Sequence, residues 1–269
     1  MKENTILVCG DIHGRKFWKE PCNNIEDYEK VIFLGDYLDP YDFENIEVQE
    51  AINNFIEIID FKKNNNDKVI LLLGNHDLPY FSKDYYKLSY YHCRHSAKYH
   101  NAISRLFENN RDLFQLAYVY NEQTLSLKKE YNDVLFTHAG VESGWLEKIV
   151  KCDETDINKI ADTINDLLSN EVGMRKLYCI TSERGGRDRY GSCVWADVHD
   201  IMLDKIHDTE AINHPIIKTK QVFGHTLQAY YDIDGAIKIG DAIEFENSKM
   251  IDTENAYELN INTFTIKKL

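Results

Sequence analysis

We predict an α/β fold from two features of the sequence: short apolar runs that end in small or polar residues, and amphipathic stretches between them. Continuous apolar runs of about four or five residues suit strands that are buried on both faces of a sheet. Strand, helix and strand in this order favour a βαβ unit, whose ligands lie beyond the carboxyl ends of the strands. The runs are Thr5–Cys9, Val31–Leu34, Val69–Leu73, Val134–Phe136 and Gln221–Phe223.

The helical stretches are recognised by apolar side chains that recur on one face of a helix. Between the second and third runs, residues 46–63 carry such a stripe through Val48, Ile52 and Ile59, with polar residues on the other faces. A second stripe extends from Ile157 to Leu168. We therefore predict a helix in each of these two stretches.

Residues 78–131 interrupt this alternation and are rich in tyrosine. We predict a helix near residues 99–108 and interpret the stretch as an insertion over the strand ends. From about residue 237, apolar and polar residues alternate, which predicts strands, and a change of phase near Asn262-Thr263 indicates a bulge or turn. We find no repeat, low-complexity linker or proline-glycine hinge, so we expect a single domain over residues 1–269.

The composition excludes several classes of protein. The chain has 269 residues, of which 43% are hydrophobic and 12% aromatic, and this is enough to bury a sizeable core. Because 45 acidic residues outnumber 31 Lys and Arg, the net charge is -14, which argues against a polybasic membrane binder and makes long nucleic acid an unlikely partner. A phosphate-bearing substrate remains compatible, since a bound metal can supply positive charge.

The cysteines and the hydropathy pattern favour a cytoplasmic protein. The 6 Cys include no Cys-x-x-Cys pair and no zinc-finger spacing, and a disulfide scaffold would be shorter and denser in cysteine. The first apolar run is too short for a signal peptide, and no stretch approaches the roughly 20 apolar residues that span a bilayer. We expect a soluble, reduced chain with no membrane partner, and the sequence carries no signal for its oligomeric state.

Side chains that bind metals follow the predicted strands. Carboxylates, imidazoles and an amide, without a thiolate among them, suit divalent cations such as Mn, Fe, Zn and Ni. Each lies beside glycine, which permits tight turns and close approach of the backbone. A single residue of this kind would be weak support for a metal site. Because such residues follow several successive apolar runs, we infer that they belong to one common site. The residues are Asp11, His13, Asp36, Asp39, Asn75, His76, Asp77, His138 and His225.

The segments that hold these residues are Gly10-Asp11-Ile12-His13-Gly14, Gly35-Asp36-Tyr37-Leu38-Asp39, Gly74-Asn75-His76-Asp77, Thr137-His138-Ala139-Gly140 and Gly224-His225-Thr226. In this order they resemble the motifs of the calcineurin-like metallophosphoesterases, above all the branch of Ser/Thr protein phosphatases, phage-type phosphatases and diadenosine tetraphosphatases. The similarity spans residues 5 to about 253, because Ile251-Asp252-Thr253 resembles the closing strand of that branch. It implies a sandwich of two mixed β-sheets flanked by helices.

The resemblance also implies a site for two divalent metal ions with Asp36 as the bridging ligand. Leu227 stands where many phosphodiesterases and nucleases of the superfamily have a second histidine, which favours the phosphatase-like branch and leaves one fewer ligand on the first metal. We expect Mn²⁺ to support activity, with Fe, Zn or Ni as alternatives. The implied ligands are Asp11, His13 and Asp36 for the first metal, and Asp36, Asn75, His138 and His225 for the second.

The reaction that the resemblance implies is attack of a metal-bound hydroxide on phosphorus. Two divalent ions about 3.5–4 Å apart can clamp the attacking and leaving oxygens and acidify a bound water. His76 resembles the general acid that protonates the leaving group. Asp39 resembles the carboxylate that orients and charges that imidazole.

One position departs from the family pattern. Protein phosphatases follow the position of Asp39 with an arginine that grips the substrate phosphate, whereas this chain has Pro40. Another arginine would have to take that role, because a guanidinium group binds phosphate through two parallel hydrogen bonds. A solvated basic loop would explain the arginines between residues 175 and 189 equally well. The candidates are Arg15, Arg94, Arg184, Arg187 and Arg189.

We therefore predict a hydrolase, a dimetal phosphoesterase that acts on phosphomonoesters, including phosphoproteins. A phosphodiesterase or a dinucleoside polyphosphate hydrolase, acting on small nucleotides, is the alternative within enzymes. A non-catalytic interaction scaffold is a third interpretation. It is disfavoured because such a scaffold would be expected to lose metal ligands or His76, and the chain has all of them.

Overall fold

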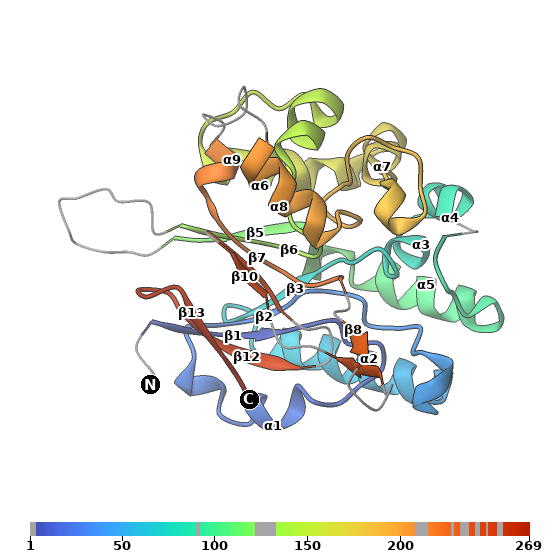
Figure 1. The fold of residues 1–269 in the computed structure, drawn as a ribbon. Helices are drawn as coiled ribbons and strands as arrows, with labels where there is room; N and C mark the ends of the chain where they lie inside the picture. The colour runs from blue at the N-terminus through green and yellow to red at the C-terminus, as the bar shows by residue number, and fades with distance from the viewer. Residues whose placement is uncertain are drawn as a thin grey trace.

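The computed structural model describes residues 4–89, 92–121, 133–207, 215–226, 229–231, 237–239, 243–245, 247–251 and 255–269. The predictions that concern Leu227, residues 252–253 and the end of the tyrosine-rich stretch lie outside these residues. Two mixed β-sheets form the centre of the described structure, and helices cover their outer faces (Figure 1). This architecture confirms the predicted fold class.

The larger sheet has six strands in the order β13-β12-β1-β2-β3-β4. β1 to β4 are parallel, whereas β12 pairs antiparallel with β1 and β13 pairs antiparallel with β12. The predicted phase change near residue 262 is therefore the turn of a hairpin. The strands are β1 (Thr5–Cys9), β2 (Lys30–Phe33), β3 (Val69–Leu72), β4 (Phe114–Gln115), β12 (Ala256–Asn260) and β13 (Thr265–Lys268).

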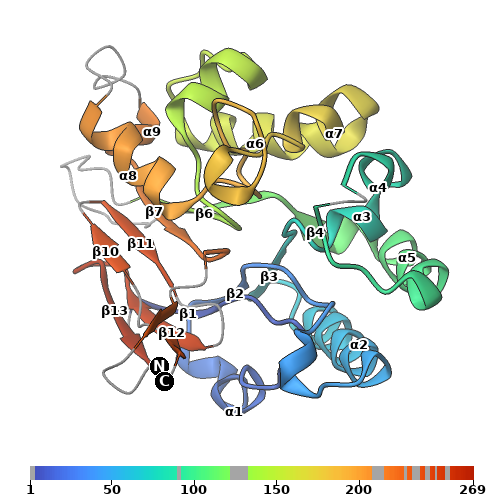
Figure 2. The ribbon, with the colours of Figure 1, turned by 45° about the vertical axis from the view of Figure 1, so that its right-hand side comes forward.

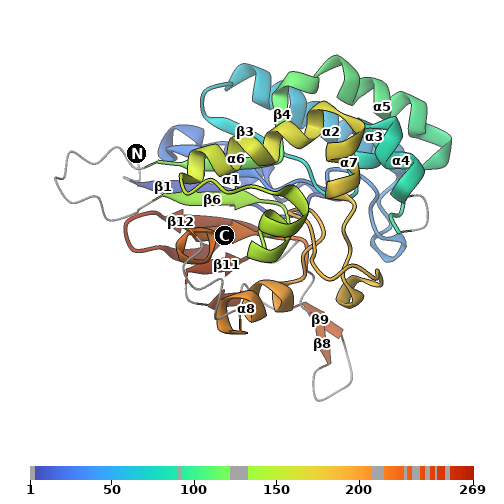
Figure 3. The ribbon, with the colours of Figure 1, turned by 90° about the horizontal axis from the view of Figure 1, so that it is seen from above.

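The second sheet has five strands in the order β10-β11-β7-β6-β5. Its three central strands are parallel and its two edge strands are antiparallel to their neighbours. A separate two-stranded sheet projects beyond α8 when the molecule is seen from above (Figure 3). The strands of the second sheet are β5 (Ala117–Tyr120), β6 (Val134–Thr137), β7 (Lys220–Phe223), β10 (Ile243–Phe245) and β11 (Ser248–Met250); β8 (Ala229–Tyr231) and β9 (Ile237–Ile239) form the third.

The two large sheets bury a common apolar layer between them. Ile6 and Ile32 point into it from one sheet, and Phe136 and Val222 from the other, and all four side chains are fully buried. The alternate residues of the same strands face outward and pack against helices. The strands are thus buried on both faces, which is why they appear in the sequence as continuous apolar runs.

Helices cover both outer faces of the sandwich. α2 packs Phe55 and Ile58 against the six-stranded sheet, in agreement with the stripe predicted over residues 46–63. α6 crosses the outer face of the five-stranded sheet, as Figure 3 shows from above, and begins where Asp156 accepts a hydrogen bond from the Asn158 amide. The helices are α1 (Lys19–Cys22), α2 (Val48–Asn64), α3 (Leu78–Phe81), α4 (Lys83–Ser89), α5 (His100–Asn109), α6 (Ile157–Asp166), α7 (Glu171–Leu177), α8 (Val198–His207) and α9 (Pro215–Lys218).

The tyrosine-rich stretch contributes to both the helical layer and the sheets. α3, α4 and α5 gather at one end of the sheets (Figure 2), and α5 matches the helix predicted near residues 99–108. Residues 114–120 then supply β4 to one sheet and β5 to the other. Among the described residues, no helix combines the length and the apolar character needed to cross a membrane.

Candidate metal centre

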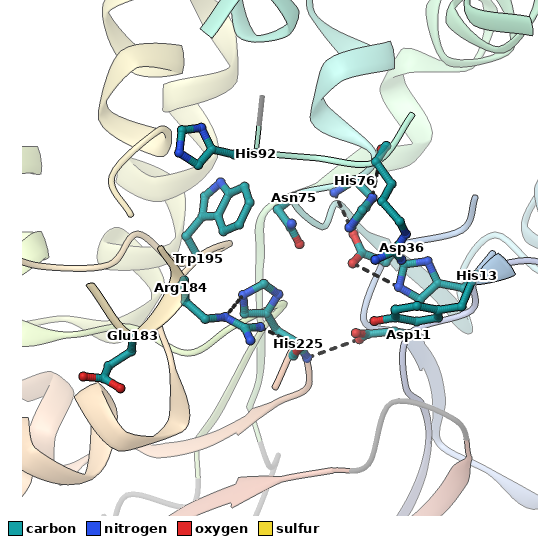
Figure 4. Close-up of a pocket in the computed structure, with 12 residues that line it drawn as sticks. Asp11, His13, Asp36, Asn75, His76, His92, Glu183, Arg184, Trp195 and His225 are labelled. Atoms are coloured by element: carbon teal, nitrogen blue, oxygen red, sulfur yellow. Dashed lines mark hydrogen bonds and ion pairs between the residues drawn. The ribbon is translucent and has the colours of Figure 1, made fainter. Parts of the chain in front are cut away.

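The loops that follow β1, β2, β3, β6 and β7 converge at one edge of the sandwich and enclose a polar pocket of about 350 Å³ (Figure 4). The parallel strands place their carboxyl ends at this edge, so residues that are far apart in the sequence meet there. The residues that line the pocket are Asp11, His13, Asp36, Tyr41, Asn75, His76, His92, Arg94, Glu183, Arg184, Trp195 and His225.

The loops after β1 and β2 extend the parallel pairing of their strands into the site. The His13 amide donates to the Asp36 carbonyl over 2.6 Å, and the Gly14 amide donates to the Tyr37 carbonyl over 3.0 Å. His13 (φ 42°) and Asp36 (φ 51°) have left-handed backbone conformations, as does His225 (φ 69°). Such conformations are costly outside glycine, so the surrounding hydrogen bonds must hold these residues in place.

Asp77, a buried residue outside the pocket lining, supplies part of that constraint. Its fully buried carboxylate accepts hydrogen bonds from the backbone amides of Asp36 (2.7 Å), Tyr37 (3.0 Å) and Gly74 (2.8 Å). One side chain therefore ties the loop after β2 to the loop after β3. Gly74 is required at this junction, because a Cβ there would lie 2.1 Å from Asp36 Oδ1.

Two groups of potential metal ligands share Asp36. In the first, His13 Nε2 lies 3.6 Å from Asp36 Oδ2, and His76 completes the group. In the second, His138 Nε2 lies 3.5 Å from Asp36 Oδ2, and His225 completes the group. Asn75 adds an amide oxygen 3.1 Å from His138 Nε2. Asp11 lines the same pocket, and its Oδ1 accepts the His225 amide over 3.3 Å.

The tautomers of His13 and His138 suit metal binding. His13 Nδ1 lies 2.8 Å from the Leu38 carbonyl oxygen, and His138 Nδ1 lies 2.8 Å from the Leu34 carbonyl oxygen. Because a carbonyl only accepts hydrogen bonds, Nδ1 carries the hydrogen on each ring and Nε2 presents a lone pair to the pocket. Oxygen and nitrogen lone pairs thus converge around Asp36. This donor set fits divalent cations.

The charges of the site favour the same interpretation. Burial lowers the pKa of His13 to about 3 and lowers that of His225 well below its usual value, so both rings are neutral at pH 7. Burial acts to raise the pKa of Asp36, but the positive charge that His138, His76 and His13 carry when they are protonated at low pH outweighs burial, and the pKa is lowered to about 2. Neutral imidazoles around an ionised carboxylate are the protonation states that a metal requires of its ligands.

Arg184 also lines the pocket and contacts this centre at His225. Its Nε donates to His225 Nε2 over 3.0 Å, and its Nη2 donates to the His225 carbonyl oxygen over 2.9 Å (Figure 4). Asp197 Oδ2 lies 3.7 Å from Arg184 Nε and helps to hold the guanidinium group in place. A cationic side chain therefore lies within hydrogen-bonding distance of a candidate metal ligand.

His76 lies beside the Asp39 carboxylate and the backbone of Arg94. Its Nδ1 is 3.2 Å from the Arg94 carbonyl oxygen and 3.7 Å from Asp39 Oδ2. Burial lowers the pKa of His76, but Asp36 and Asp39 outweigh this effect and raise the pKa above its usual value. The Arg94 guanidinium carbon lies 3.8 Å from the centre of the Tyr41 ring, which fixes this arginine at the rim of the pocket.

The structure brings most of the candidate residues from the sequence together, but not all. His138 is fully buried behind the pocket and reaches it through Nε2, and Asp39 lies behind His76. Arg15 is outside the lining because it pairs with Glu44 and donates to the Asp11 carbonyl. Exposed Arg187 and Arg189 also lie outside it, on the loop beyond Arg184.

Four residues that line the pocket were not among the candidates: Tyr41, His92, Glu183 and Trp195. Tyr41 lies two residues after the end of the second motif, and this proximity could have indicated that it belongs to the site. His92 reaches the pocket through the fold alone, and its Nδ1 pairs with the Tyr178 hydroxyl. Trp195 packs against His225, with ring centres 5.8 Å apart.

Solved structures resemble this chain at low identity. A protein serine/threonine phosphatase from Saccharomyces cerevisiae with similarity to human phosphatase PP5 has 13% identity and a TM-score of 0.43, over 97% of this chain and 74% of that one. A proposed diadenosine tetraphosphatase has 14% identity and a TM-score of 0.44, over 99% of this chain and 93% of that one. Similarity at this level does not specify a substrate.

Sequence comparison identifies the family. No curated protein matches this chain. The family model for calcineurin-like phosphoesterases matches residues 4–228, which include all the strand-end motifs and the whole of the pocket. The chain therefore belongs to the calcineurin-like phosphoesterase family and is a metal-dependent hydrolase of phosphoester bonds.

Proposed function

We propose that the chain hydrolyses phosphomonoesters, with two divalent cations held on either side of Asp36. The observation that carries this proposal is one pocket that contains two ligand groups sharing Asp36 and two arginines, Arg94 and Arg184. A phosphomonoester presents more negative charge than a diester, so a pocket with arginine on two sides suits it better. Phosphoproteins and small phosphorylated molecules are both within this class.

The ligands that we assign to the first cation are His13 and Asp36 of the first group, together with Asp11, which lines the same pocket; His76, the third member of that group, is assigned to proton transfer instead. For the second they are Asp36, Asn75, His138 and His225. The lone pairs on His13 and His138, fixed by their backbone hydrogen bonds, support this assignment. When bound, two such cations supply Lewis acidity to the phosphoryl oxygens and lower the pKa of a water for attack on phosphorus. We expect Mn²⁺ to be effective in this role.

His76 is the residue that we assign to protonation of the leaving group. Its Nδ1 faces two oxygen acceptors, the Arg94 carbonyl and Asp39 Oδ2, so Nε2 is the nitrogen that can exchange a proton with the pocket. Asp39 would stabilise the protonated ring through its negative charge. The raised pKa of His76 supports a proton donor at this position.

Arg94 and Arg184 are the residues that we assign to the substrate phosphate. Arg94 takes the role of the arginine that family members carry where this chain has Pro40, because it reaches the rim of the pocket from the loop after α4. Its Nη2 donates to the Asp39 carbonyl, which positions the guanidinium group near His76. Arg184 would contact the phosphate from the side of His225.

The test is hydrolysis of p-nitrophenyl phosphate and bis-p-nitrophenyl phosphate by metal-free protein reconstituted with Mn²⁺. We expect turnover of the monoester to exceed that of the diester. Activity should be lost with a chelator and in Asp36→Asn. A preference for the diester would contradict the proposal, and so would a metal-loaded protein that is inert toward every phosphoester.

A dinucleoside polyphosphate hydrolase is the second candidate, and one feature favours it. Phe43 is 68% exposed and stacks on Tyr41, with ring centres 5.2 Å apart, so an aromatic surface adjoins the pocket. A nucleobase could stack on this surface while its phosphate occupies the pocket. Phe43→Ala should then raise the KM for diadenosine tetraphosphate and leave the KM for p-nitrophenyl phosphate unchanged.

We also propose that residues 1–269 act as a single domain in a reducing compartment such as the cytoplasm. All 6 Cys lie among the described residues, and all are buried, free thiols. Free thiols in this number support a reducing environment. The contribution of residues 114–120 to both large sheets supports the interpretation that the tyrosine-rich stretch is part of the same domain.

A further inference from the structure

The Asp39 carboxylate is held by a buried tyrosine that belongs to no family motif quoted above. Tyr80, in the short helix α3, donates a hydrogen bond from its hydroxyl to Asp39 Oδ1 over 2.7 Å. The tyrosine is only 3% exposed, and Asp39 is 5% exposed, so this bond is shielded from solvent. A hydrogen bond to a buried carboxylate is short and strong, and it restricts how the carboxylate can rotate.

The tyrosine leaves one carboxylate oxygen to face the imidazole. Asp39 Oδ2 is buried, has no hydrogen-bond partner among the described residues, and lies 3.7 Å from His76 Nδ1. Since Oδ1 is engaged by Tyr80, rotation of the carboxylate would break that bond. Asp39 also has a left-handed backbone conformation (φ 59°), which contacts with the surrounding residues must hold in place.

The hydroxyl of Tyr80 is itself oriented by the backbone. It accepts a hydrogen bond from the Ser96 amide over 2.7 Å, so its own hydrogen must point elsewhere, toward Asp39. The His100 ring packs against Tyr80, with ring centres 5.3 Å apart, and covers it on the side of α5. Ser96, Tyr80, Asp39 and His76 therefore form one chain of polar contacts that leads from the buried helical layer to the pocket.

We propose that Tyr80 is a positioning residue for proton donation by His76, and that it acts by fixing the rotation of the Asp39 carboxylate. This inference rests on the proposed function, because it takes His76 to be the proton donor. It assigns to the chain a third member of the acid system, at a position that only the fold brings next to Asp39. Without the Tyr80 hydroxyl, the Asp39 carboxylate could rotate and turn Oδ2 away from the His76 imidazole.

The test compares Tyr80→Phe with wild type on esters whose leaving groups differ in their need for a proton. p-Nitrophenolate is a stable anion and departs without protonation, whereas an alkoxide requires a proton. For an alkyl phosphate such as glycerol 2-phosphate, we expect kcat to fall about tenfold or more, because general-acid catalysis contributes on the order of 10²–10⁴-fold. For p-nitrophenyl phosphate we expect less than about a twofold change in kcat. KM should be unchanged for both esters.

Two further variants separate positioning from a structural role. Tyr28→Phe removes another buried tyrosine hydroxyl, which donates to Glu258 in β12, outside the pocket lining, and this variant should leave both rates unchanged. In the Asp39→Ala background, Tyr80→Phe should have no further effect, because its target is already gone. If Tyr80→Phe melts at a lower temperature than wild type, Tyr80→Met is assayed beside it at a temperature where both are folded.

Equal losses of kcat on both esters, or a rise in KM on both, would overturn the inference and assign Tyr80 to holding the segment around Ser96. An additive effect of Tyr80→Phe in the Asp39→Ala background would also overturn it. A wild-type protein that hydrolyses neither ester with Mn²⁺ would instead overturn the proposed function. The two failures are thus distinguished by the wild-type rates.

Discussion

The Arg184 guanidinium donates from Nε to His225 Nε2 over 3.0 Å. A neutral imidazole that accepts at Nε2 carries its hydrogen on Nδ1, and His225 Nδ1 lies 3.1 Å from His138 Nε2, which holds a lone pair. A cation held by His225 Nδ1 would require the hydrogen to move from Nδ1 to Nε2, and Nε2 could then no longer accept from Arg184. One arginine is therefore linked both to the proposed metal centre and to the substrate pocket.

Arg184→Ala is expected to weaken substrate binding without loss of the metal. A hydrogen bond to a charged group contributes about 1.5–3 kcal/mol, so kcat/KM for p-nitrophenyl phosphate should fall about 10–100-fold. Removal of a positive charge beside His225 should leave the affinity for Mn²⁺ at least as high as in wild type, as measured by calorimetry. Arg187→Ala, an exposed change in the same loop, should alter kcat/KM by less than about twofold. Equal losses in both variants would indicate a general effect of the basic loop.

Removal of metal is expected to lower the thermal stability of the protein. A ligand that binds only the folded state stabilises it by about 2.7 kcal/mol at 100 times its dissociation constant. The melting temperature of chelator-treated protein should therefore rise as Mn²⁺ is added. Asp36→Asn should abolish this rise, because Asp36 belongs to both ligand groups, whereas the exposed change Asp112→Asn should retain it. An undiminished rise in Asp36→Asn would place the metal elsewhere.

Gly74→Ala is expected to damage the metal centre. The added Cβ would lie 2.1 Å from Asp36 Oδ1 and 2.8 Å from His138 Cε1, so both side chains would have to move. Mn²⁺ affinity and activity should both be lost. At Gly185 (φ +80°) a Cβ meets nothing within 4 Å, so Gly185→Ala should cost only about 1 kcal/mol of stability through its backbone conformation and should still bind Mn²⁺. Retention of tight metal binding in Gly74→Ala would contradict this prediction and show that the loop after β3 can shift to accommodate the added Cβ.

Phe136→Ala is expected to destabilise the sandwich. Phe136 is fully buried in the apolar layer between the sheets, and truncation of a buried phenylalanine costs about 3–5 kcal/mol. Urea denaturation should report this loss as a lower midpoint. Phe43→Ala, at a side chain that is 68% exposed, should change the free energy of unfolding by less than about 0.5 kcal/mol. Similar costs at both positions would mean that the inter-sheet layer does not dominate stability.

The sequence by itself determined the apolar strands β1, β2, β3, β6 and β7 and the polar residues that follow them, whereas β4 and β5 lie inside the stretch that it indicated as an insertion. Thr5–Cys9 is a continuous apolar run because β1 is buried on both faces, and Asp11 and His13 follow it because the sheet ends there. The stripe through Val48, Ile52 and Ile59 likewise predicted the position of α2 to within about two residues at each end. These features can be predicted locally, because the burial of one or both faces of a strand or helix fixes the spacing of apolar residues along the sequence.

Only the tertiary structure decided which residues meet at the pocket. Tyr80 and Asp39 are far apart in the chain, and no periodicity or motif pairs them, yet packing of α3 beside the loop after β2 brings the hydroxyl to the carboxylate. Arg184 and Arg187 are equivalent in the sequence, but the hydrogen bonds to His225 hold only Arg184 in the pocket. The physical reason is that side-chain hydrogen bonds join residues through the packing of distant elements, whereas the local pattern records only which faces are buried.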